Sequence, residues 1–260
     1  MYLGGMRGIL VLSTMVLGLG LQAGTTSASS FKVTPVRVTF SGPSSTLLTL
    51  RNESDQPLRF QISSFTWSQD ARGSVQLSPT DDIVFFPALL TLNAGEERKV
   101  RVAATVAATD VEKTYRIFFE ELPPLEKKDD KTGAQVRILT KMGIPIFVTP
   151  AKGYAQATVD SMRIEKGVVS FEVRNSGNVH FGLQGVKLRG MSSSGETLFE
   201  KQLDGWYVLA GSPRTYSLEI PESVCPRLKT VAIEAQTDVT SIGSAGTVAT
   251  QFEVQPASCR

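Results

Sequence analysis

Apolar residues recur at every second position from Phe31 onward, and this period constrains the fold more than any other feature of the sequence. Val36, Val38 and Phe40 alternate with polar residues, which is the pattern of a strand with one buried face. Turn clusters rich in Gly, Ser, Asn and Pro separate further short runs, at 48–50, 60–62, 99–102, 115–119, 136–148, 168–173, 207–209 and 231–233. Since no long segment has helical period, the sequence predicts an all-β sandwich or barrel.

The succession of strands and turns is interrupted once, at the Pro-Ala-Lys-Gly segment 150–153. The two halves on either side contain roughly 110–120 residues each, which is the size of an immunoglobulin-like sandwich. We therefore predict two immunoglobulin-like β-sandwich domains, an N-terminal one over 29–150 and a C-terminal one over 151–260.

The first thirty residues have the composition of a secretory signal. They contain no acidic residue and one basic residue, Arg7, followed by an apolar run from Gly8 to Leu21 and small residues at 26–28. The apolar run of about 14 residues is shorter than the ~20 that a membrane-spanning helix needs. We therefore expect a cleaved signal peptide over 1–28 and a soluble, exported protein.

Charge and residue inventory exclude several classes of function. Lys and Arg number 27 against 25 Asp and Glu, so the chain lacks the dense basic face that nucleic-acid binding requires. Two cysteines and one histidine are too few for a metal site or for most hydrolytic mechanisms. We expect no enzyme activity, cofactor, metal or small-molecule substrate, a turn position for His180, and core positions for Trp67 and Trp206.

The two cysteines, Cys225 and Cys259, both lie in the last 36 residues. Two cysteines of one domain in an oxidising compartment are more often a disulfide than two free thiols. We predict that they are bonded, with two unpaired thiols as the alternative.

The segment from Ala134 to Val148 has apolar residues at almost all even positions and follows a charged loop at 126–133. This pattern predicts a single strand of fifteen residues, against a usual length of about five or six. We expect 144–148 to fill the core. The first half can lie at a sheet edge, where unpaired N–H and C=O groups accept a strand from another chain.

Four segments together resemble the periplasmic pilus-assembly chaperones, the PapD-like family. They are FKVTPVRV at 31–38, LRNES at 50–54, TYRIFFEELPP at 114–124 and GIPIFVTP at 143–150. The resemblance implies two immunoglobulin-like domains arranged as a boomerang. It also implies a periplasmic chaperone that holds pilin or other fibre subunits and delivers them to an outer-membrane usher.

In that family the chaperone donates its long strand to a subunit that lacks one strand. The resemblance places the donor residues at Ala134, Val136, Ile138 and Thr140, whose side chains would enter pockets of the subunit groove. Thr140 is a polar departure from a run of apolar donors.

The family also anchors the subunit's C-terminal carboxylate with two cations, one from the first strand and one from the long strand. Arg37 falls on the first position, whereas Pro145 occupies the second. Lys141, on the same side of the strand by parity, and Arg116 are the alternative second cations. This departure is similar to the divergent, archaic branch of the family.

A second interpretation is an exported β-sandwich adhesin or carbohydrate-binding protein. Such a protein would carry aromatic and polar residues on loops at one tip of a sandwich, whereas a chaperone needs a long exposed strand and a cationic cleft. A self-assembling pilin is a third possibility, but it would lack a complete set of strands and a second domain.

Overall fold

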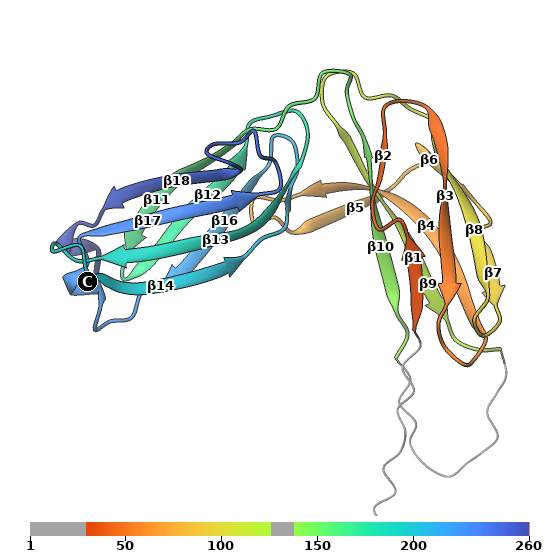
Figure 1. Ribbon diagram of the computed structural model, residues 1–260, viewed down its shortest axis with the longest axis horizontal. Coiled ribbons are helices and arrows are strands. Elements are labelled where there is room, and N and C mark those ends of the chain that lie inside the picture. Colours follow the sequence, from red (N-terminus) through yellow and green to blue (C-terminus); the bar gives the residue numbers. More distant parts are fainter. Residues whose placement is uncertain (1–29, 126–137, 260) are drawn as a thin grey trace, which may run out of the picture.

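The computed structural model describes residues 30–125 and 138–259, which form strands and two short 3-10 helices (Figure 1). The predicted all-β fold is confirmed. The predicted signal peptide and the donor residues Ala134 and Val136 lie outside the described residues. In the part of the chain that is described, no helix has the length and apolar character needed to cross a membrane.

Two sheets pack face to face in the first domain. One has the order β1 (Phe31–Thr34), β3 (Ser44–Asn52), β8 (Glu97–Ala104) and β6 (Ile83–Phe86). The other, here called the cleft sheet, has the order β2 (Val38–Phe40), β10 (Lys141–Val148), β9 (Lys113–Leu122), β4 (Leu58–Gln69) and β5 (Val75–Pro79), with β7 (Leu89–Leu92) also on β4. Side chains from both sheets form one buried hydrophobic core.

The second domain is also built from two sheets around a separate core. One sheet contains β11 (Ala157–Glu165), β12 (Val168–Asn175) and β16 (Pro213–Glu219). The other contains β14 (Thr197–Asp204), β13 (Phe181–Met191), β17 (Thr230–Thr237) and β18 (Thr247–Glu253), with β15 (Tyr207–Val208) also on β13. The 3-10 helices are η1 (Cys225–Arg227) and η2 (Pro256–Cys259).

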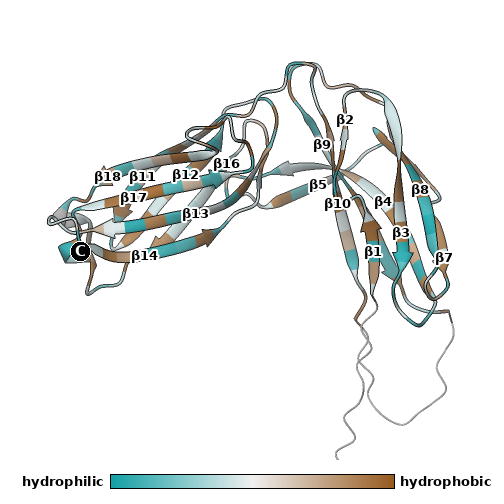
Figure 2. Cartoon of the chain, in the orientation of Figure 1, coloured by the Kyte–Doolittle hydropathy of each residue, from teal (hydrophilic) through white to brown (hydrophobic). Residues whose placement is uncertain are grey.

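Apolar and polar residues alternate along the strands, as the change of colour along them shows (Figure 2). In β9, Tyr115, Ile117 and Phe119 are buried in the core, whereas Arg116 and Phe118 between them are only partly buried. Successive strand residues point to opposite faces, so Arg116 and Phe118 lie on the outer face of the cleft sheet.

Each domain contains one fully buried asparagine as the last residue of a strand, Asn52 of β3 and Asn175 of β12. In both, Nδ2 donates to the carbonyl four residues later at 2.8 Å, and Oδ1 accepts from the backbone N–H two residues later at 2.9 Å. A buried amide is costly unless it is hydrogen-bonded. The same pair of asparagine hydrogen bonds therefore closes an equivalent turn in each domain.

The predicted disulfide is confirmed, and the alternative of two free thiols is wrong. Cys225 in η1 is bonded to Cys259 in η2, with 5.7 Å between their Cα atoms. The bond closes the end of the second domain that lies away from the first (Figure 1).

Strand β10 is shorter than the sequence predicts, because it begins at Lys141 rather than at Ala134. Its register with β9 pairs Lys141 with Glu120, so the residues just before β10 lie opposite the end of β9, and Ile138 lies opposite Pro123. Proline has no N–H to donate to a ladder. Regular pairing therefore stops, although the Glu121 N–H still donates to the Thr140 carbonyl at 2.9 Å.

The two domains meet at an angle, joined by residues 149–156 between β10 and β11 (Figure 1). The cleft sheet of the first domain faces the space between the two domains (Figure 1). Contacts across the junction come from β4, β9, β10 and the segments before β2 and before β9 in the first domain.

Candidate functional site

Three positions from neighbouring strands form a row on the cleft sheet. Ile146 pairs with Val38 on β2, and Pro145 pairs with Arg116 on β9. Because Arg37 directly precedes Val38, it lies level with Pro145, and the row runs Arg37, Pro145, Arg116. Strands lie ~4.8 Å apart, so the backbones of the two arginines are about 10 Å apart. Pro145, which the resemblance places at the second cation position, therefore has a cation on each side.

The Arg116 guanidinium lies over two tryptophan rings. Its Cζ is 4.2 Å from the centroid of Trp67 on β4 and 5.6 Å from that of Trp206 in the second domain. Cations at this distance from an aromatic face are attracted by the ring quadrupole. We call Trp67, Trp206 and Arg116 the aromatic clamp.

The charge of Arg116 has no acidic partner in the part of the chain that is described. Burial lowers the pKa of the guanidinium, and the nearby Tyr207 acts in the opposite direction. Its Nε atom is buried and has no hydrogen-bond partner among the described residues. Since arginine stays protonated in proteins, the clamp holds a partly desolvated positive charge that a carboxylate would compensate.

The other two predicted cations each have a carboxylate partner. Arg37 lies 3.9 Å from Asp238 of the second domain, in an exposed ion pair. Lys141 Nζ lies 2.7 Å from Glu120 and 5.0 Å from the centroid of Phe118. Lys141 is also four positions from Pro145 along β10, about 13 Å at the rise of a strand. The structure thus places Arg37 and Arg116 together and Lys141 apart from them.

A small hydrophobic cluster joins the domains beside the clamp. Trp67, Phe147 and Leu209 are buried in it, and Tyr207 packs against them. Trp67 and Tyr207 are edge-to-face with 5.6 Å between centroids. We call these four residues the interdomain core. The expected core position of Trp67 is therefore confirmed, whereas that of Trp206 is wrong, because Trp206 is 44% exposed at the clamp.

His180 has a structural partner that its sequence neighbourhood does not reveal. Its Nδ1 lies 2.7 Å from Oε2 of Glu112, which is fully buried, and its ring stacks on Phe147 at 3.5 Å. The two partners come from different domains and are 68 residues apart in the chain. The pair therefore links the second domain to the end of the first domain that supports the clamp.

Among the described residues, no strand pairs with part of the β10 edge that faces away from β9. β2 pairs only with Ile146–Val148, and no other described strand pairs with this edge between Lys141 and Pro145. Just before β10, Ile138 is 62% exposed and Leu139 is 41% exposed. Of the predicted donor residues, Ile138 and Thr140 therefore lie beside a free sheet edge.

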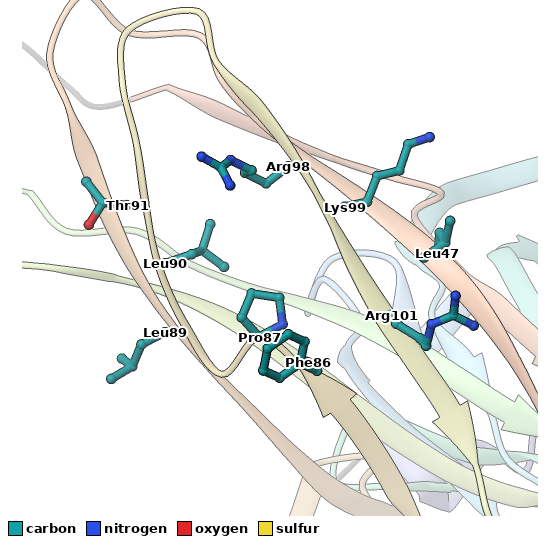
Figure 3. Close-up of a pocket in the computed structure, with 9 residues that line it drawn as sticks. All are labelled: Leu47, Phe86, Pro87, Leu89, Leu90, Thr91, Arg98, Lys99 and Arg101. Carbon is teal, nitrogen blue, oxygen red and sulfur yellow. The ribbon is translucent and has the colours of Figure 1, made fainter.

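A separate hollow of about 570 Å³ lies on the first domain (Figure 3), and none of the clamp residues lines it. Phe86, Leu89 and Leu47 line it together with Arg98 and Arg101. Phe86 and Leu89 are among the most exposed apolar residues of the described chain. Among the described residues, no group of three His, Cys, Asp or Glu side chains is placed to hold a metal ion.

Comparison with known proteins identifies the first domain. Residues 30–153 match the family of pili and flagellar-assembly chaperones, PapD N-terminal domain. No curated protein matches the chain in sequence.

Solved structures show the same fold over most of the chain. The chaperone CfaA of class 5 fimbriae is 14% identical with a TM-score of 0.53, covering 85% of this chain and 98% of that one. A chain in the CsuC–CsuE chaperone–tip subunit complex from archaic Csu pili of Acinetobacter baumannii is 18% identical, with a TM-score of 0.55 and coverage of 85% and 97%. A chain in the Salmonella enterica SafA pilin–SafB chaperone complex is 16% identical, with a TM-score of 0.51 and coverage of 88% and 99%.

These identities are low, so the solved structures establish the two-domain fold, and the assignment to the archaic branch stays a prediction. The family itself rests on the match of the first domain. The predicted resemblance is confirmed: residues 30–153 match the PapD N-terminal domain family of pili and flagellar-assembly chaperones, and most of the chain shares the two-domain fold of the solved structures.

Proposed function

We propose that this protein is a non-enzymatic periplasmic chaperone that holds pilin subunits by donor-strand complementation and delivers them to an outer-membrane usher. The observation that carries the proposal is the uncovered edge of β10 beside the exposed Ile138. A free edge offers unpaired N–H and C=O groups to another chain, and alternate apolar side chains give that pairing specificity.

The donor segment extends from Ala134 through Val136 and Ile138 to Thr140. Its apolar side chains fill the groove that the subunit's missing strand leaves open, and its backbone completes the subunit's sheet. Without a donated strand such a groove would pair with other edges and aggregate.

The carboxylate anchor is the pair Arg37 and Arg116, which lie on either side of Pro145. Arg116 has the stronger claim, because its charge is partly desolvated and has no acidic partner among the described residues. Arg37 must release Asp238 before it can bind a carboxylate, and Lys141 already binds Glu120 at a distance from the row.

The adhesin interpretation has less support. A carbohydrate platform needs an open aromatic face, and the exposed Trp206 instead lies over Arg116 in the clamp between the domains. We therefore keep it only as the alternative outcome of the test below.

The test is co-production with the pilin subunit of the same gene cluster, followed by isolation of the complex from the periplasm. Ile138→Asp would force a carboxylate into an apolar pocket, which costs several kcal/mol, so we expect no subunit to be recovered. Leu89→Asp is the matched control, because Leu89 is 63% exposed against 62% for Ile138 but lies in the hollow of Figure 3. Full recovery of the subunit by a folded Ile138→Asp variant would contradict the proposal.

A further inference from the structure

Gln69, at the end of β4, spans the two domains with one side chain. Its Nε2 donates to the carbonyl of Tyr207 at 2.7 Å, and its Oε1 accepts from the N–H of Leu209 at 3.0 Å. One amide thus bonds a donor and an acceptor two residues apart on the same segment. A side chain that makes both bonds fixes the segment in position and in orientation, as a neighbouring strand would.

The segment that Gln69 holds carries one wall of the aromatic clamp. Trp206 directly precedes Tyr207, and its ring lies 5.6 Å from the Arg116 guanidinium. The other ring of the clamp, Trp67, lies two residues before Gln69 on the same strand and therefore on the same face. Both walls of the clamp are thus tied to the end of β4, one through the backbone and the other through the Gln69 amide.

We infer that Gln69 is a positioning residue for the subunit's carboxylate. It keeps Trp206 over Arg116, so that the guanidinium is held in one place before a subunit arrives. This inference rests on the proposed function for its link to subunit binding, whereas the effect of Gln69 on Trp206 belongs to the free protein. Holding a binding group in its bound geometry strengthens binding because less freedom is lost on association.

A second contact between the domains makes the inference specific. Near the tip of the β4–β5 hairpin, the carbonyl of Ala71 accepts from the Thr215 N–H at 3.1 Å and from the Thr215 hydroxyl at 2.8 Å. Thr215 lies on β16, and neither residue is a member of the clamp. If Gln69 merely held the domains together, loss of the Thr215 hydroxyl would have a similar effect.

The first experiment uses the free protein and needs no subunit. The chain contains two tryptophans, so an ¹H–¹⁵N spectrum shows two indole N–H signals, which Trp206→Phe assigns. We expect Gln69→Leu to shift or broaden the Trp206 signal and Thr215→Val to leave it in place. An unchanged Trp206 signal in Gln69→Leu, or an equal change in Thr215→Val, would overturn the inference.

The second experiment measures competition between each variant and the unmodified chaperone for a limiting amount of the co-produced pilin subunit. We expect Gln69→Leu to bind about tenfold more weakly, the net loss of roughly one hydrogen bond. Gln69→Leu combined with Arg116→Ala should be no weaker than Arg116→Ala alone, because residues that act through one another are not additive. Additive losses would contradict the positioning role. Normal binding by Arg116→Ala would refute the proposed anchor, and the Trp206 signal would still decide what Gln69 does.

Discussion

The two ends of the segment 138–148 have similar apolar composition but opposite surroundings. At the first end Ile138 and Leu139 are exposed, and β9 is the only described ladder neighbour up to Pro145. At the second end Ile146 and Phe147 are fully buried, and both β2 and β9 pair with the strand. The same types of apolar residue are therefore exposed beside a sheet edge at one end of the segment and buried in the protein interior at the other.

The difference follows from the neighbouring strands rather than from the segment itself. β9 ends at Leu122 before two prolines, and β2 is only three residues long. An apolar stretch that its own domain leaves uncovered is a place for another chain to bind. Substitutions at the two ends should therefore separate folding from subunit capture. The predictions below are ordered by the expected change in the free energy of unfolding.

The largest change is expected for Phe147→Ala. Phe147 is fully buried in the interdomain core and stacks on His180, and truncation of a buried phenylalanine costs about 3–5 kcal/mol. Ile138→Ala should stay within about 0.5 kcal/mol, since exposed positions contribute little. Urea unfolding of the two variants measures both values. Equal destabilisation would show that the two ends do not differ as described.

Reduction of the Cys225–Cys259 disulfide should cause the second-largest loss in the free energy of unfolding. The bond joins residues 34 apart, for which the chain-entropy model gives about 3–4 kcal/mol. Because it closes the far end of the second domain (Figure 1), it should lower the stability of that domain without changing the edge at Ile138. Thermal melts with and without reductant, each paired with recovery of the subunit, test this. A reduced protein that stays folded but no longer captures a subunit would contradict it.

The strands, the two sandwiches and the disulfide could be predicted from the sequence. They depend on the period of apolar residues, on the length of each half and on the oxidising compartment, respectively. The sequence was insufficient for the site, because the site depends on register. The residues alone leave Arg116 and Lys141 as alternative second cations, and only the pairing of Arg116 with Pro145 shows that Arg116 lies in the row with Arg37. The early end of the β9–β10 ladder likewise follows from which residues face the prolines.

Contacts between the domains were beyond sequence reasoning for the same reason. Gln69 and Tyr207 are 138 residues apart, and Glu112 and His180 are 68 apart. No local pattern marks either pair. The exposed position of Trp206 also depends on the angle between the domains. The predicted burial was therefore wrong for Trp206, although it was correct for Trp67.

Arg37→Ala, like Ile138→Ala, should change the free energy of unfolding only slightly. Its ion pair with Asp238 is 3.9 Å long, and half of the Arg37 side chain is exposed. Ion pairs of this kind contribute about 0–1 kcal/mol, so the urea midpoint should hardly move. If Arg37 flanks the bound carboxylate, the variant should nevertheless compete for the subunit at least about tenfold less well, because truncating one partner of a buried charge pair costs about 2–5 kcal/mol. Asp238→Asn is the matched control: it removes the same ion pair from the other side and frees Arg37, so it should bind the subunit as well as the parent or better. Equal losses in the two variants would mean that the ion pair itself, and not a free Arg37, supports binding.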